Sequence, residues 1–379
     1  MNKKLLTFIT LISLTTLLAC GKNHGNGGNS SGNDDDGYRP YEDGEAKNNK
    51  GFGTLFNEVL GYNTKDAAVI QDGNERYVVY ASNETEKGAQ VFAARKATLE
   101  NGKWSYGAKK IVFRGNESGW DKSIFNPSIV KGIFAYQGTT YSYLMAYNAT
   151  DGSDFNNHIG LAVSNDILAE WKRVGNKPIL ENPEVQESAY GYGSPSLVSY
   201  DQGGKGYMFY AAGETDVSYE AVRTYDFSNL DHPVLEAGYS SMPINGITDK
   251  VEGSAVIVNA GFALSNDGNS IYIVRDRLPQ SPSRPNQATE VEIAHASKDI
   301  LQDFSLSWTV SDNITGMKTM DMDDPESLGW DEIYSGEFVT DPYGKLLPGT
   351  TAEVIYSTYD EDANSPSYSA TLASYEVQL

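Results

Sequence analysis

The chain has 379 residues and a formal net charge of −22, with 39% hydrophobic residues, 21% charged residues and a single cysteine. This length allows a large core, and the composition excludes collagen-like, coiled-coil and disulfide-stapled proteins. A surface this negative repels phosphate backbones and anionic lipid headgroups. We therefore expect no nucleic-acid partner.

Residues 1–19 have the pattern of a secretory signal peptide. Lys3 and Lys4 precede an apolar run, residues 5–18, that is short for a membrane-spanning helix. The sequence Leu18-Ala19-Cys20-Gly21 resembles a bacterial lipobox, which implies that Cys20 becomes the acylated, palmitate-bearing N-terminus. Cleavage would change the net charge from −22 to −24, because both lysines are lost. The alternative is an ordinary signal peptide followed by an unpaired cysteine.

This lipoprotein signal predicts a protein of the bacterial cell envelope, at the outer membrane or the cell surface, that contacts the membrane only through its N-terminal lipid. Residues 20–50 are mostly Gly, Asn, Ser and Asp and have little to bury, so we expect a disordered linker. The run Asp34-Asp35-Asp36 within it is more typical of a solvated charge run than of a calcium site.

From residue 51 to residue 379 the sequence predicts one domain made of repeated strand pairs. Short runs of β-branched and aromatic residues, bounded by Gly, Asn and Asp, are typical of strands. A short strand followed by a second strand occurs five times, at 67–70 and 77–80, 127–130 and 143–147, 195–198 and 207–210, 254–257 and 271–274, and 336–339 and 354–357. The residues that precede the first strands are 66, 126, 194, 253 and 335, at steps of 60, 68, 59 and 82. Repetition on this scale indicates blades or an array.

A later part of the unit also repeats, because residues 162–171 match residues 294–304 with one insertion. Five units of about four strands with little helix predict an all-β fold, a five-bladed β-propeller. Two β-sandwich domains are the alternative, although sandwiches would not repeat one strand pair five times. In a propeller the first strand of each blade lines the central channel, so the residues before these strands should meet at one axial pocket.

Two acidic residues stand at these predicted blade starts. Asp66 precedes the first blade and Glu252 precedes the fourth, so both carboxylates should face the axial pocket. Glycoside hydrolysis needs such a pair, one carboxylate to activate water or attack and one carboxylic acid to protonate the leaving oxygen. The alternatives are that Asp66 only caps a turn and that Glu252 is an exposed loop acid.

The order of these blade starts resembles the five-bladed propeller glycosidases, most closely the arabinanase- and xylosidase-like glycoside hydrolase family 43, over nearly all of residues 51–379. The resemblance implies that Asp66, followed by Ala67 where the family has Pro, is the general base of an inverting mechanism. It implies that the Glu of Glu252-Gly253-Ser254 is the general acid. The family's Trp-Ala-Pro-Asp motif falls on Phe125-Asn126-Pro127-Ser128, which implies that Phe125 and Asn126 bind substrate, although such a Phe is more typical of a core.

The third blade departs from the family pattern. An Ile-Asp-Pro-Ser motif there supplies an Asp that orients the acid and tunes its pKa, whereas this chain has Ser194 at that pKa-modulator position. A carboxylate near Glu252 would raise its pKa by like-charge repulsion, and a neutral hydroxyl cannot. Asp216 or Glu214 is a possible substitute.

Two functions therefore stay open. The first is a lipid-anchored glycosidase that hydrolyses a glycan or oligosaccharide by inversion. The second is a propeller that has lost catalysis and binds a glycan or a protein. A purely structural envelope protein has less support, because it would not need converging acids.

Other chemistries find little support in the sequence. The residues around Ser194 lack the Gly-x-Ser-x-Gly pattern, and the four histidines lack His-Glu-x-x-His spacing, so we expect no cofactor. The acidic residues 321–326 could hold calcium through oxygen ligands, but Pro325 breaks the EF-hand pattern, which favours an acidic loop instead. We read Arg275-Asp276-Arg277 as a salt-bridged surface and expect a monomer.

Overall fold

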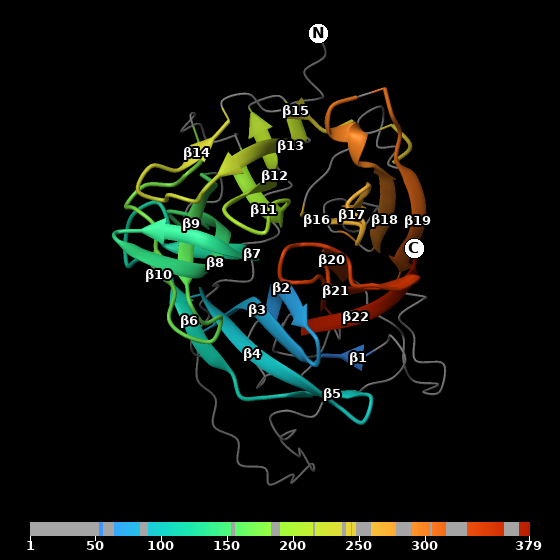
Figure 1. Cartoon of the computed structure of the whole chain (residues 1–379), viewed down its shortest axis with the longest axis horizontal. Coiled ribbons are helices and arrows are strands. Elements are labelled where there is room, and N and C mark those ends of the chain that lie inside the picture. The colour runs from blue at the N-terminus through green and yellow to red at the C-terminus, as the bar shows by residue number, and fades with distance from the viewer. Residues whose placement is uncertain are drawn as a thin grey trace, which may run out of the picture.

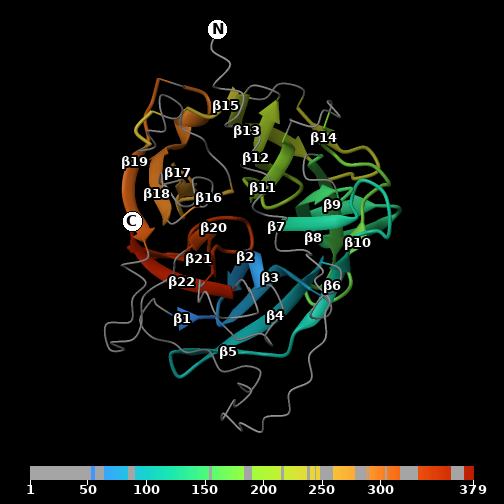
Figure 2. The ribbon, with the colours of Figure 1, turned by 180° about the vertical axis from the view of Figure 1, so that it is seen from behind.

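The computed structural model describes residues 53–55, 64–83, 90–152, 156–182, 190–214, 217–236, 240–243, 245–247, 259–277, 288, 290–303, 305–315, 332–359 and 371–379. Within these ranges the only helix is the 3-10 turn η1 (Lys298–Leu301), and none is long and apolar enough to cross a membrane. The strands form five antiparallel sheets arranged around a central axis (Figures 1 and 2). The predicted all-β fold and five-bladed propeller are confirmed.

Each sheet is one blade, and its first strand lies nearest the axis. Blade one contains β2 (Thr64–Asp72), β3 (Glu75–Asn83), β4 (Gln90–Glu100), β5 (Lys103–Tyr106) and β6 (Lys110–Arg114), and blade two contains β7 (Ser123–Tyr136), β8 (Thr139–Thr150), β9 (His158–Ser164) and β10 (Lys172–Arg173). Blade three contains β11 (Gly191–Ser199), β12 (Lys205–Glu214), β13 (Val217–Asp226), β14 (Val234–Leu235) and β15 (Ser240–Ser241). Blade four contains β16 (Ala260–Leu264), β17 (Ser270–Arg277), β18 (Glu290–Ser297) and β19 (Thr309–Thr315), and blade five contains β20 (Glu332–Phe338), β21 (Thr351–Tyr359) and β22 (Thr371–Gln378).

The N-terminal end of the domain closes the circle. The short strand β1 (Gly53–Thr54) pairs antiparallel with β22, so blade five takes its outermost strand from the start of the domain. The Leu55 amide extends this pairing by donating to the Leu372 carbonyl. The first and last blades are therefore joined by main-chain hydrogen bonds.

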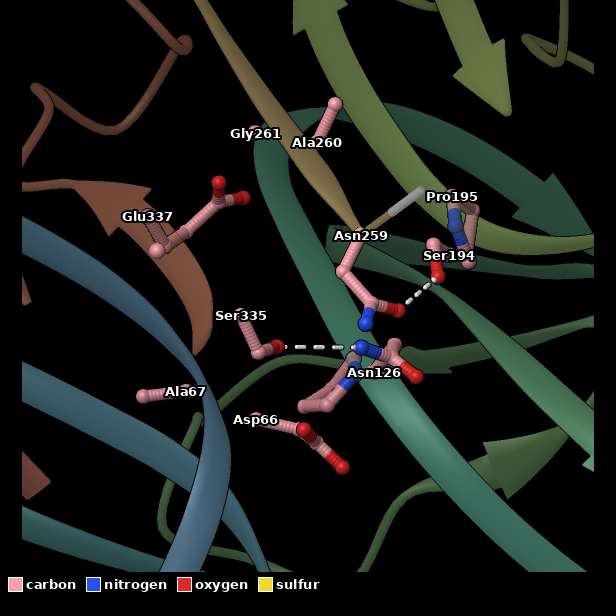
Figure 3. A pocket seen from close by; sticks show the side chains of 12 residues that line it. Asp66, Ala67, Asn126, Ser194, Pro195, Asn259, Ala260, Gly261, Ser335 and Glu337 are labelled. Atoms are coloured by element: carbon pink, nitrogen blue, oxygen red, sulfur yellow. Dashed lines mark hydrogen bonds between the residues drawn. The ribbon is translucent and has the colours of Figure 1, made fainter. Parts of the chain in front are cut away.

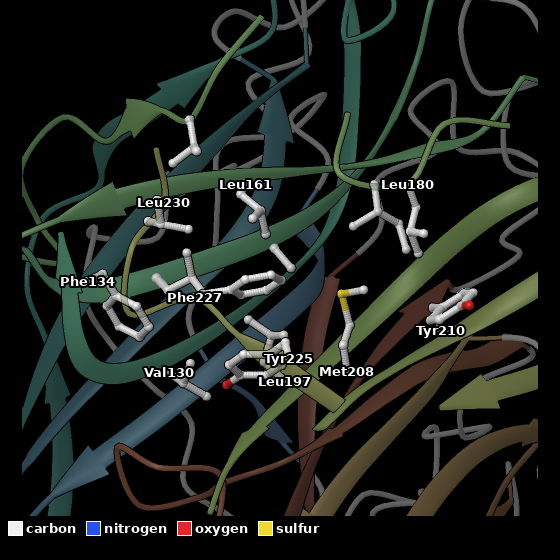
Figure 4. Packing of buried hydrophobic residues seen from close by; sticks show 14 of the residues in the cluster. Val130, Phe134, Leu161, Leu180, Leu197, Met208, Tyr210, Tyr225, Phe227 and Leu230 are labelled. Atoms are coloured by element: carbon white, nitrogen blue, oxygen red, sulfur yellow. The ribbon is translucent and has the colours of Figure 1, made fainter. Parts of the chain in front are cut away.

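Five apolar clusters fill the spaces between neighbouring blades. Blades two and three share the largest one, in which Val130 and Leu161 of blade two face Met208 and Tyr210 of blade three (Figure 4). The other four clusters lie between the remaining pairs of adjacent blades. Each sheet thus buries both of its faces, which explains why the strand sequences contain continuous β-branched and aromatic runs. The repeated segment found in the sequence contributes Ile167 and Ile300, which are both buried.

Residues 340–346 of blade five cross one end of the central channel. Their carbonyl groups accept hydrogen bonds from backbone amides on the inner strands of the other four blades, Gln71 of β2, Lys131 of β7, Ser199 of β11 and Leu264 of β16. Because most of these donors lie near the C-terminal ends of the inner strands, this crossing segment occupies that end of the channel. The N-terminal ends of the inner strands lie at the opposite end.

The predicted start of blade four is wrong. The sequence favoured residues 254–257, Ser-Ala-Val-Ile, as the inner strand because the run ends in β-branched residues. In the structure the inner strand is β16, whose sequence Ala-Gly-Phe-Ala-Leu has weaker strand propensity but pairs in register with β17. The residue that precedes it is Asn259, so Gly253 does not hold the position predicted for it.

An ion pair between blades one and five yields a stability prediction. The Arg76 guanidinium is buried, makes two hydrogen bonds to the Glu353 carboxylate, and lies 4.2 Å from the Trp104 ring centroid. Removing one partner of a buried pair leaves a charge uncompensated. We expect Glu353→Ala to lower the free energy of unfolding by roughly 3 kcal/mol, measured by urea denaturation. The exposed Glu376→Ala on the neighbouring strand is the control, and equal stability of the two variants would contradict this assignment.

Candidate functional site

Five non-glycine residues with positive φ mark the N-terminal ends of the inner strands. They are Asp66, Asn126, Ser194, Asn259 and Ser335, one per blade, with φ between 44° and 53°. In blades one, two, three and five each of them stands where the pairing of the first two strands shifts register, as at a β-bulge. Non-glycine residues adopt this left-handed conformation rarely, and such strain tends to collect at functional sites. We call these five residues the axial ring.

The axial ring lines one pocket on the propeller axis. The space outside the atoms is about 280 Å³, part of it open to solvent. The remaining lining comes from the residue that follows each ring position and from two further residues, namely Ala67, Pro127, Pro195, Ala260, Gly336, Gly261 and Glu337 (Figure 3). The structure therefore brings Asp66, Asn126 and Ser194 together from three different blades, at the end of the channel opposite the crossing segment.

Hydrogen bonds join four of the five ring residues to one buried carboxyl group. The Ser194 hydroxyl donates to Asn259 Oδ1 at 2.8 Å, and Asn126 Nδ2 donates to the Ser335 hydroxyl at 3.2 Å (Figure 3). Asp276 of β17 accepts from both sides, from Asn259 Nδ2 at 2.9 Å and from the Ser335 amide at 2.6 Å. Asp276 thus lies at the centre of a chain that runs from Asn126 to Ser194.

Asp66 is the one carboxylate among the ring positions. Its backbone amide donates to the Ser357 hydroxyl at 2.9 Å, and its Oδ2 lies 3.6 Å from the Lys65 ammonium. The side chains of both residues are almost fully buried. The Lys65 ammonium also lies 5.2 Å from the centroid of the Phe125 ring. A single anionic group, with one cation beside it, therefore faces the pocket from blade one.

Two further acids lie around the pocket and have strongly raised pKa values, the buried Asp276 and the half-buried Glu337. Burial raises the pKa of Asp276 to about 8, and the charge of Asp66 adds to this effect, while the hydrogen bonds from Asn259 and Ser335 oppose it. Burial alone raises the pKa of Glu337 to about 8. Both carboxyl groups therefore hold a proton more tightly than an ordinary carboxyl group does.

Glu337 lies between the pocket and a second axial cavity. This cavity, of about 290 Å³, is also lined by Thr340 and Gly344 of the crossing segment. Gly261 makes room for the carboxyl group, because a Cβ atom at that position would lie 1.5 Å from Glu337 Oε2. Glu337 of blade five can therefore take this position only because residue 261 of blade four has no side chain.

A third acid, Glu220 of β13, is 1% exposed. Neither of its carboxyl oxygens has a hydrogen-bond partner in the part of the chain that the structure describes. Burial raises the pKa of Glu220 well above its usual value. Burial raises the pKa of Tyr190, which lies beside Ser194, to about 12, and the nearby Glu220 carboxyl group adds to this increase. The buried acids therefore surround the pocket on several sides.

Sequence reasoning missed these acids. They lie in strands that are mostly apolar, as in Ile271-Tyr272-Ile273-Val274-Arg275-Asp276. An acidic residue within such an apolar run was the sequence feature that could have indicated a buried acid. The salt bridges predicted for Arg275-Asp276-Arg277 are present, but the surface location is wrong, because neighbouring blades cover the second strand of each blade. Arg275 is fully buried and its guanidinium pairs with the buried Glu292, and only Arg277 is partly exposed.

The other predicted site residues divide into two groups. Phe125 is 8% exposed, lies beside Lys65 and does not line the pocket, and its substrate-binding role stays a prediction. Glu252 and Cys20 lie outside the described residues, as do Asp216, the side chain of Glu214 and the acidic stretch 321–326. The general-acid role of Glu252 also stays a prediction.

The ring position of blade four carries an amide where the resemblance implies an acid. Asn259 cannot donate a proton as a carboxylic acid does, so the ring residues alone do not form a catalytic carboxyl pair. Among the described residues, no three His, Cys, Asp or Glu side chains lie close enough together to hold a metal ion.

The fold is shared with glycoside hydrolases of known structure. A family-62 hydrolase in complex with xylotriose matches with a TM-score of 0.53 and 10% sequence identity, covering 88% of this chain and 97% of that one. An α-L-arabinofuranosidase from Podospora anserina in complex with cellotriose matches with a TM-score of 0.52 and 10% identity, covering 89% and 96%. A family-117 glycoside hydrolase from the marine bacterium Zobellia galactanivorans matches with a TM-score of 0.53 and 12% identity, covering 89% and 90%.

Neither a protein-family model nor a curated protein sequence matches the chain. The structural similarity establishes the fold, which is that of the five-bladed propeller glycoside hydrolases. The resemblance predicted from the sequence is confirmed at this level.

The raised pKa of Glu337 predicts how stability depends on pH. The folded protein keeps a proton on this group that the unfolded chain releases above its ordinary pKa of 4.5. Stabilisation is therefore complete below about pH 4.5 and declines, by up to about 1.4 kcal/mol per pH unit, until about pH 8. We expect the wild type to lose stability relative to Glu337→Gln as the pH rises from 5 to 8, measured by urea denaturation. Glu376→Gln, an exposed change in the same blade, is the control, and a constant difference between wild type and Glu337→Gln would contradict the prediction.

Proposed function

We propose that the axial pocket is a glycan-binding site and that the protein is a glycosidase-like lipoprotein of the bacterial cell envelope, anchored through a lipid on Cys20. The observation that carries the proposal is the axial ring, in which five polar side chains from five blades meet at one pocket. Solved structures with the same fold contain xylotriose and cellotriose, which supports an oligosaccharide as the ligand.

The chemistry of the pocket suits a polyhydroxylated ligand. Hydroxyl, amide and carboxylate groups at its mouth can exchange hydrogen bonds with sugar hydroxyls. The net charge of −22 and the carboxylate of Asp66 disfavour anionic ligands such as nucleic acid. We propose that the protein acts as a monomer at the outer membrane or cell surface.

Hydrolysis by inversion is the first form that this function can take. Asp66 would accept a proton from water as the water oxygen attacks the anomeric carbon, and Glu252 would donate a proton to the leaving oxygen as the glycosidic bond breaks. Glu252 lies seven residues before Asn259 in the sequence, which supports a place near the blade-four side of the pocket. An inverting pair requires the two carboxyl groups to be about 6.5–9.5 Å apart.

Binding without turnover is the second form, and the ring itself favours it. Ser194 and Asn259 occupy the inner-strand starts of blades three and four, where the resemblance implies carboxyl groups. Neither a hydroxyl nor an amide can supply the proton that a leaving oxygen needs at neutral pH. Glycan binding is common to both forms, and turnover on aryl glycosides distinguishes them.

The first experiment measures turnover of aryl arabinosides, xylosides and galactosides between about pH 4 and 7. If the pocket hydrolyses glycans, wild type should be weakly active with an acid-shifted optimum, because Glu252 must be protonated to donate. Asp66→Asn and Glu252→Gln should then lose about 10²–10⁴-fold, and Ser194→Asp should gain activity near pH 7. Equal rates for wild type and Glu252→Gln would exclude Glu252 as the acid.

Binding provides the second readout on the same variants. If the pocket only binds, none of them should turn over any glycoside, and Asp66→Asn should weaken the binding of xylotriose measured by calorimetry. Glu376→Gln, an exposed change on blade five, is the control. Unchanged binding and unchanged turnover in Asp66→Asn would contradict the proposed site.

The anchor is tested by Cys20→Ser. A thioether-linked lipid needs the cysteine sulfur, so we expect this change to leave the precursor uncleaved or to release protein into the soluble fraction. Fractionation and mass spectrometry of the N-terminus measure both effects. Normal processing and unchanged membrane partition of Cys20→Ser would show that the protein is not a lipoprotein.

A further inference from the structure

Asp276 is hydrogen-bonded to two residues of the axial ring, Asn259 and Ser335. Its Oδ1 is held at 2.6 Å by the Ser335 amide, and its Oδ2 accepts from Asn259 Nδ2 at 2.9 Å. The other end of the Asn259 amide, Oδ1, accepts from the Ser194 hydroxyl. Asp276 itself is 4% exposed and does not line the pocket. It acts on the pocket only through its neighbours.

The direction of this chain follows from the chemistry of its members. A carboxylate only accepts hydrogen bonds, so it turns the NH₂ group of Asn259 toward itself and the amide oxygen toward Ser194. A serine hydroxyl has one hydrogen, which is then committed to Asn259. The neutral Tyr190 hydroxyl, which is hydrogen-bonded to Ser194, then donates to the Ser194 oxygen. The oxygen of Ser194 has one lone pair left, and with it Ser194 faces the pocket as a hydrogen-bond acceptor.

We infer that Asp276 is the positioning residue that sets the hydrogen-bond polarity of the axial ring, and that a single proton on it changes Ser194 from an acceptor to a donor. The amide of Ser335 keeps Oδ1 of Asp276 an acceptor, so the proton sits on Oδ2, facing Asn259. The Asn259 amide then turns its oxygen toward Asp276 and its NH₂ toward Ser194. Because the neutral Tyr190 hydroxyl still donates to the Ser194 oxygen, the hydrogen of the Ser194 hydroxyl becomes free to point at a ligand.

The surroundings of Asp276 place this change within reach of ordinary pH. Its pKa is raised to about 8, chiefly by burial. The charged and titratable groups that act on it are Asp66, across the ring, which raises the pKa, and Arg275, its neighbour on β17, which lowers it. Tyr190 near Ser194 also faces this carboxyl group and stays neutral throughout, because its own pKa is about 12.

The consequence for recognition rests on the proposed function. With Asp276 ionised, Ser194 and Asp66 both present hydrogen-bond acceptors to the pocket, and a free sugar hydroxyl can donate to them. A methylated oxygen at that place would leave Ser194 without a donor partner. With Asp276 protonated, Ser194 offers a donor and suits a ring, glycosidic or methylated oxygen. The ring therefore distinguishes free from substituted sugar oxygens according to pH.

An experiment without ligand tests the hydrogen bonds between Asp276, Asn259 and Ser194 directly. Carboxyl-¹³C aspartate and side-chain ¹⁵N asparagine labels in the full chain report Asp276 and Asn259 by NMR between about pH 6 and 10. We expect the Asn259 side-chain signals to shift with the same midpoint as the Asp276 carboxyl, and to stop shifting in Asp276→Asn. If the Asn259 side-chain signals of the wild type do not shift as Asp276 titrates, the inference is overturned, whether or not the protein binds glycans.

Calorimetry with xylotriose and its permethylated form tests the consequence. Asp276→Asn carries a donor at all pH values, so it should abolish the pH dependence of the preference between the two ligands. Preference in wild type should change about tenfold across the titration, the effect of one neutral hydrogen bond near the upper end of its usual range. The exposed Asp267→Asn, at the other end of blade four, should behave as wild type.

A double-mutant cycle separates positioning from a general structural role. Ser194→Ala removes the last member of the hydrogen-bond series that starts at Asp276. In this background Asp276→Asn should therefore have no further effect on the preference between xylotriose and its permethylated form. An equal effect of Asp276→Asn with and without Ser194 would overturn the inference. If neither ligand binds any variant, the proposed function fails, and the NMR titration alone decides the role of Asp276.

Discussion

Positive φ at the five axial-ring residues is the constraint on which the site depends. Each blade has to turn its first strand inward at the channel mouth, and a left-handed residue at a bulge does this at a conformational cost of about 1 kcal/mol or more per position. Asn and Asp tolerate this conformation best among non-glycine residues, and three of the five positions carry them. The same turn aims each side chain at the axis. A polar ring is therefore a direct consequence of how the blades begin.

Buried acids are the second consequence of this architecture. Burial raises the pKa of both Asp276 and Glu337 to about 8, and each group is matched by a specific neighbour. Asp276 accepts two hydrogen bonds from ring groups, whereas Glu337 occupies the space that Gly261 leaves open. Burial of these groups favours low pH for stability. The polarity of the pocket depends on the proton of Asp276, which does not itself line the pocket.

The sequence predicted the fold well and the site in part. Strand pairs with strong β-propensity recur at a spacing that only blades explain, and positions 66, 126, 194 and 335 were placed correctly because a clear strand follows each one. Blade four failed because its inner strand, with Gly261 in its middle, is locally weak and is defined by pairing with β17. Asp276 could not be recognised as a ring partner, since its role arises from contacts between strands and between blades that no local pattern records.

The ring retains Asp66 from the glycosidase pattern but has neutral groups at Ser194 and Asn259, so binding at the axis is the claim on which the account depends most. An experimental structure of the full chain with bound xylotriose tests it most directly. The account predicts a sugar ring seated over the axial ring, with hydroxyl groups within hydrogen-bond distance of Asp66 and Ser194. Xylotriose bound elsewhere on the propeller, with the axial pocket empty at saturating concentration, would contradict it.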